Sequence, residues 1–146
     1  MNSVNSTSLK NFSHSVGQNW YHVVLIPRSR YALFAQEHQR ALMIQAIAWI
    51  CERHKIEVFT QEIMEDHVHL FISCPPDCSI RKLVQIIKGG SSYYMRKHHF
   101  ALKQYKALWS KGFMYRSVGS VSAEIVKHYI DHSNTWFPAR NQTKLV

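Results

Sequence analysis

The chain has 146 residues, and its 18 lysine and arginine residues outnumber its 9 aspartate and glutamate residues, so the formal net charge is +9. This length predicts one domain that can bury a core without disulfides, and no apolar run approaches the roughly 20 residues of a membrane helix. The excess of cations predicts a polyanionic partner, while the lack of a dominant basic amphipathic segment argues against an anionic membrane. The three cysteines, an odd number with no secretory leader before them, predict reduced thiols and a cytoplasmic protein.

The N-terminal part of the sequence predicts a tail, a strand and a helix. Residues 1–18 are rich in asparagine, serine and threonine, so they bury too little apolar surface to offset the cost of ordering them, and we expect a flexible tail. Residues 20–26 are aromatic and β-branched up to Pro27, which predicts a buried strand. Between residues 36 and 54, apolar residues recur with the spacing of an amphipathic helix.

A β-hairpin that carries two histidines is predicted next. Residues 56–64 alternate as a strand, a polar turn follows at 65–66, and a second strand runs to Ser73. Side chains two apart on a strand share a face, and at roughly 3.3 Å per residue the Cα atoms of His67 and His69 lie about 7 Å apart. The two imidazoles are therefore close enough to bind one metal ion, and the apolar residues that alternate with them face a core.

A long basic helix follows the hairpin. Ser79 is placed to cap a helix that runs to about residue 98, with a polar and cationic outward stripe. The Gly89-Gly90 pair inside it costs about 1 kcal/mol per residue against alanine, so either the helix bends there or something approaches its backbone closely. Cationic side chains of this helix and of the loop after the first strand are the expected phosphate contacts. These residues are Arg28, Arg30, Lys82, Lys88 and Arg96.

The C-terminal part predicts a fourth strand over residues 113–118 and a last helix, capped by Ser122, that carries Tyr129. The order strand, helix, strand, strand, helix, strand, helix predicts an α+β fold. We expect a ferredoxin-like antiparallel sheet with two helices on one face and a C-terminal helix carrying the tyrosine. One domain is expected over residues 19–137, followed by a C-terminal tail over residues 138–146.

Tyr129 shares a helix face with His132 and Ser133, which follow it at i+3 and i+4. Together with the histidine pair of the hairpin, these residues supply metal ligands and a nucleophile. A phenol, with a pKa near 10, attacks poorly at neutral pH unless a metal ion or a base assists it. Attack by a tyrosine on DNA would conserve the bond energy in a phosphotyrosine, so no ATP would be required. The sequence contains no Walker-type glycine loop, and we expect no nucleotide cofactor.

Several short motifs occur in an order that is similar to that of a known family. They are Y-H-V-V at residues 21–24, D-H-V-H-L at 66–70, L-V-Q-I-I-K-G at 83–89 with S-S at 91–92, L-W-S at 108–110, S-V-G at 117–119 and V-K-H-Y-I at 126–130. Over about residues 21–133 the chain resembles the single-tyrosine HUH transposases, the TnpA type of the smallest bacterial insertion sequences. A lone His-x-His motif is weak, but the ordered set is specific.

This resemblance implies a homodimeric DNA transposase that binds single-stranded DNA hairpins at insertion-sequence ends. It implies cleavage and rejoining of one strand through a 5′-phosphotyrosine, with magnesium or manganese, and in many members each tyrosine acts beside the histidine pair of the partner subunit. By position, His67 and His69 are the implied metal ligands and Tyr129 is the implied nucleophile. The family usually places a glutamine ligand four residues after the tyrosine, where this chain has Ser133, and we expect His132 to replace it.

Several alternatives stay open from the sequence. Asp131, Asn134 or water could serve in place of His132, and the chain could be a decayed, inactive copy. The histidine pair could join Cys74 and Cys78 in a structural zinc centre, although that spacing is not a common zinc pattern. A non-catalytic nucleic-acid-binding module with the same ferredoxin-like fold would need the basic face but neither the histidine pair nor the tyrosine.

Overall fold

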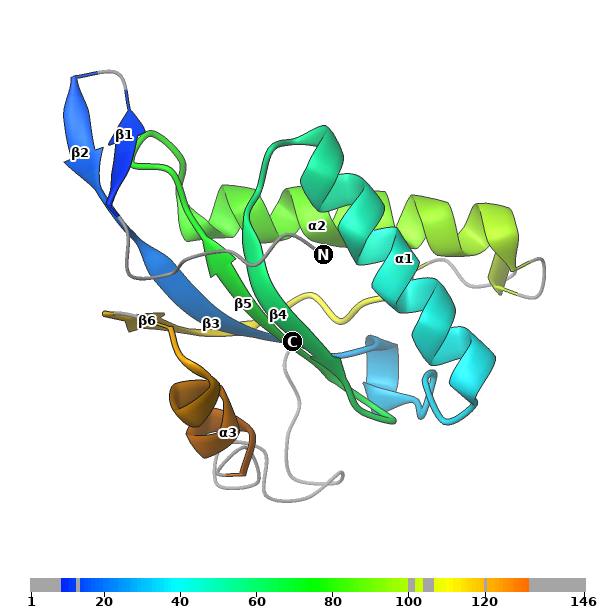
Figure 1. Cartoon of the computed structure of the whole chain (residues 1–146). Coiled ribbons are helices and arrows are strands. Elements are labelled where there is room, and N and C mark those ends of the chain that lie inside the picture. Colours follow the sequence, from blue (N-terminus) through cyan, green and yellow to red (C-terminus); the bar gives the residue numbers. More distant parts are fainter. Residues whose placement is uncertain (1–8, 13, 100–101, 104–106, 120, 132–146) are drawn as a thin grey trace.

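An antiparallel sheet of four strands forms the centre of the computed structural model, which describes residues 9–12, 14–99, 102–103, 107–119 and 121–131 (Figure 1). The strands are β3 (Trp20–Leu25), β4 (Val58–Ile63), β5 (Val68–Ser73) and β6 (Met114–Val118). They lie in the order β4-β5-β3-β6, and every neighbouring pair is antiparallel.

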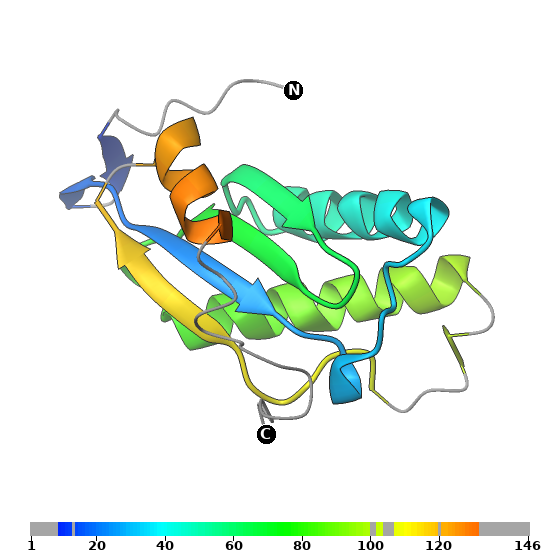
Figure 2. The same ribbon diagram turned by 90° about the horizontal axis from the view of Figure 1, so that it is seen from below.

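In the described residues, three α-helices accompany the sheet. α1 (Glu37–Arg53) connects β3 to β4, α2 (Ile80–His98) connects β5 to β6, and α3 (Ala123–Asp131) follows β6. α1 and α2 lie side by side on one face of the sheet, and α3 lies on the opposite face (Figure 1 and Figure 2). This β-α-β-β-α-β order with an added C-terminal helix confirms the predicted ferredoxin-like fold.

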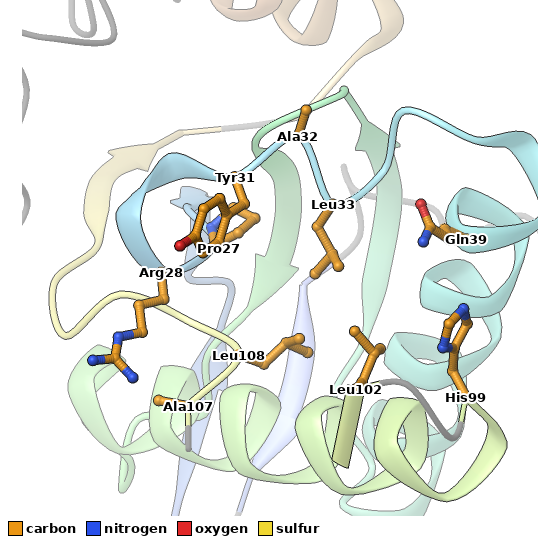
Figure 3. Close-up of a pocket in the computed structure, with 10 residues that line it drawn as sticks. All are labelled: Pro27, Arg28, Tyr31, Ala32, Leu33, Gln39, His99, Leu102, Ala107 and Leu108. Atoms are coloured by element: carbon orange, nitrogen blue, oxygen red, sulfur yellow. The ribbon is translucent and has the colours of Figure 1, made fainter. Parts of the chain in front are cut away.

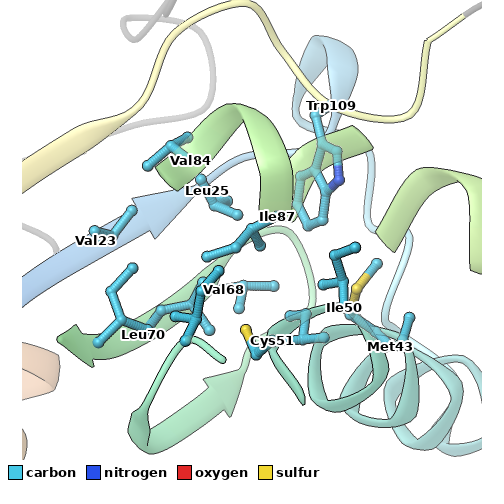
Figure 4. Packing of buried hydrophobic residues seen from close by; sticks show 14 of the residues in the cluster. Val23, Leu25, Met43, Ile50, Cys51, Val68, Leu70, Val84, Ile87 and Trp109 are labelled. Carbon is cyan, nitrogen blue, oxygen red and sulfur yellow. The ribbon is translucent and has the colours of Figure 1, made fainter. Parts of the chain in front are cut away.

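The two faces of the sheet carry different side chains, because successive residues of a strand point to opposite sides. Val23 and Leu70 are fully buried in the main core, between the sheet and the helix pair α1 and α2 (Figure 4). Trp20 and Phe71 have the opposite parity and pack with Val126 of α3 in a second cluster. This second cluster attaches the tyrosine-bearing helix to the sheet.

The helix ends and lengths follow the sequence signals. Oγ of Ser79 accepts a hydrogen bond from the backbone N–H of Lys82 at 3.1 Å, and Oγ of Ser122 accepts one from the N–H of Ile125 at 3.3 Å. Both predicted caps are therefore confirmed.

In the described part of the chain, no helix combines the length and the apolar character needed to cross a membrane.

The glycine pair lies within α2, which continues through both residues. A Cβ atom on Gly90 would lie 2.1 Å from Cγ1 of Ile50 in α1, whereas a Cβ atom on Gly89 would meet nothing within 4 Å. Of the two explanations that the sequence allows, the close approach is the one found at Gly90. The missing side chain lets α1 pack directly against α2.

Part of the stretch predicted as a flexible tail is paired instead. β1 (Lys10–Phe12) and β2 (Ser15–Gly17) form an antiparallel hairpin before β3. Lys10 forms an ion pair with Glu57, and its Nζ lies 5.6 Å from the ring centroid of Trp20. Backbone hydrogen bonds and these side-chain contacts order a segment whose composition shows no apolar periodicity.

Candidate active site

The β4–β5 hairpin brings the two predicted histidines together, with one difference in detail. β5 begins at Val68, so His67 lies in the turn before the strand, where the backbone N–H of Met64 donates a 2.8 Å hydrogen bond to the carbonyl of His67. The ring centroids of His67 and His69 are 4.9 Å apart, and the ring planes make an angle of 75°. The two imidazoles are thus direct neighbours.

Asp66 links His67 to an arginine from a distant turn. Oδ1 of Asp66 accepts a 2.8 Å hydrogen bond from Nδ1 of His67, and Oδ2 accepts a 2.9 Å bond from Nε of Arg30. Arg30 ends the short 3₁₀ helix η1 (Arg28–Arg30), in which φ is 57° at Ser29 and 53° at Arg30. Such left-handed conformations cost non-glycine residues about 1–3 kcal/mol each and persist only where the surroundings impose them.

His22 of β3 lies directly behind His69. In the register of β3 and β5, His22 lies opposite Phe71 and Val24 lies opposite His69, so the two histidines are diagonal neighbours on one face. His22 Nε2 and His69 Nδ1 are 2.8 Å apart, while the ring centroids are 5.1 Å apart with an angle of 7° between planes. Rings joined edge to edge by a bond of this length have centroids about 5 Å apart. The contact is therefore an in-plane hydrogen bond and not a face-to-face stack.

Burial keeps His22 and His69 neutral, since both side chains are fully buried. Burial, and to a lesser extent the Arg116 guanidinium, lowers the pKa of His22 to about 4. Burial, followed by the charges of His67 and His22, lowers the pKa of His69 to about 3. The neutral imidazole is the form that binds a metal ion, so His69 is in a suitable state at neutral pH.

Tyr129 of α3 lies against the same group of rings. Its ring centroid is 5.0 Å from that of His22, with an angle of 29° between planes, and 6.2 Å from that of Phe71. The guanidinium carbon of Arg116, on β6, lies 5.8 Å from the Tyr129 ring centroid. Tyr129 is half-buried and lines a pocket of about 330 Å³. Within one chain, the tyrosine therefore contacts a histidine that is itself hydrogen-bonded to His69.

Two imidazole nitrogens of this cluster fit a metal ion. Within the described part of the chain, Nε2 of His67 and Nε2 of His69 are buried and have no hydrogen-bond partner. A buried polar atom without a partner is costly, and a lone pair on each of these nitrogens would be satisfied by a shared cation. The residues that the structure describes contain no group of three or more His, Cys, Asp or Glu side chains that could hold a metal ion. The expected third ligand, His132, lies outside the described residues, as does Ser133.

Cys74 and Cys78 do not join the histidine pair. Sγ of Cys74 donates to the carbonyl of Cys78 at 3.0 Å, and Sγ of Cys78 donates to the carbonyl of Ser79 at 3.4 Å. Burial is the main cause that raises the pKa of Cys74 to about 11, which disfavours the thiolate that a zinc site requires. The described residues also contain no group of three or more His, Cys, Asp or Glu side chains that could hold a metal ion, so the structure contradicts a zinc centre built from these cysteines and the two histidines.

Two of the side chains predicted to contact phosphates have partners within the chain. Arg30 and Asp66 form a nearly buried pair, with side chains 12% and 13% exposed. Nζ of Lys88 donates 2.8 Å hydrogen bonds to the carbonyls of Ser110 and Gly112, and burial lowers its pKa. Lys88 therefore connects α2 to the segment before β6.

The other three predicted phosphate contacts lie at the surface of η1 and α2. Arg28 and Lys82 are exposed, and Arg96 is partly buried. Arg28 and the exposed ring of Tyr31 line a pocket of about 350 Å³ that also borders α1 and the end of α2 (Figure 3). Arg96 and Lys97 line a hollow of about 560 Å³ along α2. Neither hollow is lined by His22, His67 or His69.

Sequence reasoning missed the roles of four residues of this site. His22 had a usable signal, because a histidine in an otherwise apolar buried strand must find a hydrogen-bond partner. The sequence pattern predicts Asp66 only as a turn residue, and it predicts Arg30 only as a phosphate contact. Arg116 had no signal, because only the pairing of β6 with β3 brings it to the side where α3 packs.

Comparisons with known sequences agree on one family. The family model described as "Transposase IS200 like" matches residues 15–133. The transposase for insertion sequence element IS200 of Salmonella typhimurium is 28% identical over 126 residues, which cover 84% of this chain and 82% of that protein. The ISDra2 transposase TnpA of Deinococcus radiodurans is 27% identical over 117 residues, which cover 76% of this chain and 81% of that protein.

Solved structures share the fold. A Deinococcus radiodurans R1 protein described as a transposase has a TM-score of 0.68 at 23% identity, covering 84% of this chain and 96% of that one. A REP-associated tyrosine transposase bound to a REP hairpin has a TM-score of 0.54 at 16% identity, covering 90% of this chain and 74% of that one. The family match includes both neighbouring histidines and Tyr129 within its span. The chain therefore belongs to the IS200-like transposase family.

Proposed function

We propose that this transposase cleaves and rejoins single-stranded DNA at insertion-sequence ends, using Tyr129 as the nucleophile and a divalent metal ion held by His67 and His69. The observation that carries this proposal is the contact of Tyr129 with His22, at 5.0 Å between ring centroids, and the hydrogen bond between the rings of His22 and His69. A nucleophile close to a pair of imidazoles suits metal-assisted phosphoryl transfer.

In the cleavage step, the phenolic oxygen of Tyr129 attacks the phosphorus of one phosphodiester. A bond forms between that oxygen and the phosphorus, and the bond between the phosphorus and O3′ breaks. The phenolic proton is lost to solvent, and the departing O3′ takes up a proton to become a 3′-hydroxyl. Rejoining reverses the exchange, because a 3′-hydroxyl attacks the 5′-phosphotyrosine and releases the phenol. One ester replaces another in each direction, so no nucleotide cofactor is needed.

The proposed metal ligands are Nε2 of His67 and Nε2 of His69, with His132 as the third ligand. When bound, a divalent cation polarises a non-bridging phosphodiester oxygen and stabilises the charge that develops there. The guanidinium of Arg116, beside the Tyr129 ring, adds a cation near the nucleophile. The ion is proposed to be magnesium or manganese from the family resemblance, since imidazole by itself suits zinc or copper better.

We propose a single-stranded DNA hairpin as the partner and a homodimer as the assembly. The structurally similar REP-associated tyrosine transposase is bound to a REP hairpin, and the net charge of +9 suits a polyanion. Arg28, Lys82 and Arg96 are the proposed phosphate contacts at the surface. Arg30 and Lys88 are proposed to contribute less, because their polar groups already have partners within the chain.

The test is covalent capture of DNA. The protein is incubated with manganese and a hairpin-bearing single strand taken from the DNA that flanks its gene, and a denaturing gel reveals any adduct. The wild type and a Tyr115→Phe control, which alters an exposed tyrosine of β6, are expected to form the adduct. Tyr129→Phe is expected to form none. An adduct that persists in Tyr129→Phe would refute Tyr129 as the nucleophile.

The same assay tests the metal role and the non-catalytic alternative. His67→Ala is expected to reduce the adduct strongly, and an unchanged yield would refute His67 as a ligand. A wild-type protein that binds the hairpin but never forms an adduct, with either magnesium or manganese, would favour a nucleic-acid-binding module or an inactive copy.

A further inference from the structure

We propose that three residues behind the histidine pair are positioning residues that select the tautomer of each metal ligand. Asp66, held by Arg30, acts on His67, and His22 acts on His69. This inference rests on the proposed function, because it concerns how the chain prepares these two histidines to receive the ion.

The hydrogen bond to Asp66 determines the tautomer of His67. A carboxylate only accepts hydrogen bonds, so the 2.8 Å contact with Oδ1 of Asp66 requires a proton on Nδ1 of His67. A neutral imidazole carries a single proton, so Nε2 of His67 then has a lone pair to offer. In many metal sites a carboxylate accepts a hydrogen bond from a metal-binding histidine in this way, which fixes both the tautomer and the orientation of that ring.

Arg30 holds the carboxylate in place from the other side. Its Nε donates a 2.9 Å hydrogen bond to Oδ2 of Asp66, and the two side chains are only 12% and 13% exposed. The left-handed backbone at Ser29 and Arg30 is held by hydrogen bonds from the N–H of Arg30 to Pro27 and from the N–H of Arg28 to Leu108. A turn with two consecutive left-handed residues thus delivers this guanidinium to Asp66.

His22 acts on His69 through an in-plane hydrogen bond. His22 and His69 are both buried, and between two neutral rings one nitrogen must donate and the other accept. For Nε2 of His69 to offer a lone pair, its Nδ1 must carry the proton and donate to Nε2 of His22. The ring of His22 is kept in position by Phe71, at 4.6 Å between centroids, and by Tyr129, at 5.0 Å. In the proposed arrangement both ligands therefore carry the proton on Nδ1.

The first test reads the tautomers directly in metal-free protein. Long-range ¹⁵N–¹H NMR correlations of the imidazole rings distinguish a proton on Nδ1 from a proton on Nε2. The wild type is expected to show the Nδ1–H form for both His67 and His69. Asp66→Ala is expected to remove that preference at His67 while leaving His69 unchanged, and His22→Phe is expected to do the converse. The Nε2–H form at either histidine of the wild type would overturn the role of the residue proposed to position it.

The second test measures manganese affinity by isothermal titration. Asp66→Ala and His22→Phe are each expected to weaken binding by about 10–100-fold, the usual effect of removing an outer hydrogen-bond partner. Asp66→Asn and His22→Gln, which keep an acceptor oxygen, are expected to lose less. The matched control is Asp77→Ala, which removes an exposed carboxylate from the turn before α2 and is expected to leave the affinity unchanged. Thermal melts establish that each variant is folded.

The outcomes separate this inference from the proposed function. If the wild type shows the expected tautomers but binds no manganese, the metal-dependent function fails while the selection of tautomers stands. If the wild type binds manganese and both variants bind it equally well, the positioning roles are overturned while the function stands. Should Asp66→Ala not fold, Arg30→Gln provides the same comparison for His67.

Discussion

The histidine at the centre of the site shows how one buried polar residue organises its neighbours. His22 is fully buried in a strand whose other residues are apolar or aromatic, and a buried imidazole without a partner would be costly. Its hydrogen bond to His69 satisfies one nitrogen, and its ring packs against Phe71 and Tyr129, which also contact each other. The same side chain therefore joins β5, which carries His69, to α3, which carries Tyr129.

The buried histidines predict an acid-sensitive fold. His22 and His69 have pKa values of about 4 and about 3 in the folded chain, against about 6.5 for an exposed histidine. Below pH 6.5 the unfolded chain binds more protons than the folded one, so the stability present above that pH is lost as the pH falls towards 4. Each histidine is expected to contribute a loss of about 2 kcal/mol between pH 7 and pH 5. Urea unfolding across this range, with a chelator present, measures the effect.

Substitution of His22 measures how much this one histidine contributes to the pH dependence of the unfolding free energy. His22→Gln removes one of the two titrating groups, so its unfolding free energy should fall less steeply between pH 7 and pH 5 than that of the wild type. A wild-type free energy that stays constant over the same interval would contradict the assignment of both rings as neutral and buried.

The end of α1 predicts a stabilising substitution. The N–H of Ile56 bonds to the carbonyl of Cys51 and that of Lys55 to the carbonyl of Glu52, which is a Schellman motif with Lys55 at the left-handed position, φ 56°. Glycine is preferred there, because a Cβ atom costs about 1–2 kcal/mol in this conformation, offset in part by the entropy of the unfolded chain. Lys55→Gly is expected to raise the unfolding free energy by about 0.5–1 kcal/mol, measured by urea denaturation.

The control for that substitution keeps the Cβ atom. Lys55→Ala removes the same exposed charge but leaves the strained conformation, so it should not stabilise the protein. Equal gains for alanine and glycine would attribute the effect to charge and not to the backbone.

At the scale of elements, the packing of α1 on α2 depends on a single missing side chain. Gly90 faces Ile50 of α1, while the neighbouring Gly89 faces open space, so one glycine is required by packing and the other is not. The two residues share a helix and differ only in the face on which they lie, which makes them a matched pair.

Alanine substitutions at the two glycines are expected to have opposite effects. Gly89→Ala should stabilise α2 by up to about 1 kcal/mol, because alanine has the higher helix propensity. Gly90→Ala should destabilise the protein by about 1–3 kcal/mol, since its Cβ would lie 2.1 Å from Cγ1 and 2.7 Å from Cβ of Ile50. Chemical denaturation of both variants measures the difference. Similar free energies for the two would show that α1 does not pack as closely on Gly90 as the structure places it.

At the scale of the whole molecule, charge is unevenly available to a partner. The chain carries a net charge of +9, yet the nearly buried Arg30 and the partly buried Lys88 already donate hydrogen bonds to groups within the fold. Arg28, Lys82 and Arg96 are placed at the surface of η1 and α2. We therefore expect the salt dependence of DNA binding to depend mainly on Arg28, Lys82 and Arg96.

Replacing Arg28, Lys82 and Arg96 by glutamine is expected to reduce the slope of log K against log salt concentration by about 2, because each phosphate contact to a single strand contributes about 0.7. Fluorescence anisotropy with a labelled hairpin over a range of salt concentrations measures the slope. A matched variant replaces Arg53 and Lys55, two exposed cations at the end of α1. An equal loss per charge in both variants would contradict a specific surface and indicate a net-charge effect.

The strands of the four-stranded sheet, the helices and the fold class could be predicted from the sequence alone, as could the proximity of His67 to His69. Helix periodicity, caps at Ser79 and Ser122, and the two-residue spacing of His67 and His69 depend only on neighbouring residues, so they are visible without a structure. The pairing of residues 10–17 was not visible, because it comes from backbone hydrogen bonds and from contacts of Lys10 with residues far along the chain.

The partners of His67 and His69 became visible only in the fold. His22 and His69 are 47 positions apart, and Arg30 and Asp66 are 36 apart. Their contacts follow from the register of β3 on β5 and from the left-handed turn after β3, neither of which a local pattern encodes. The sequence predicts Arg30 as a phosphate contact, but in the fold its guanidinium is the partner of the Asp66 carboxylate. Both side chains are nearly buried, and a charge withdrawn from water needs an opposite charge beside it.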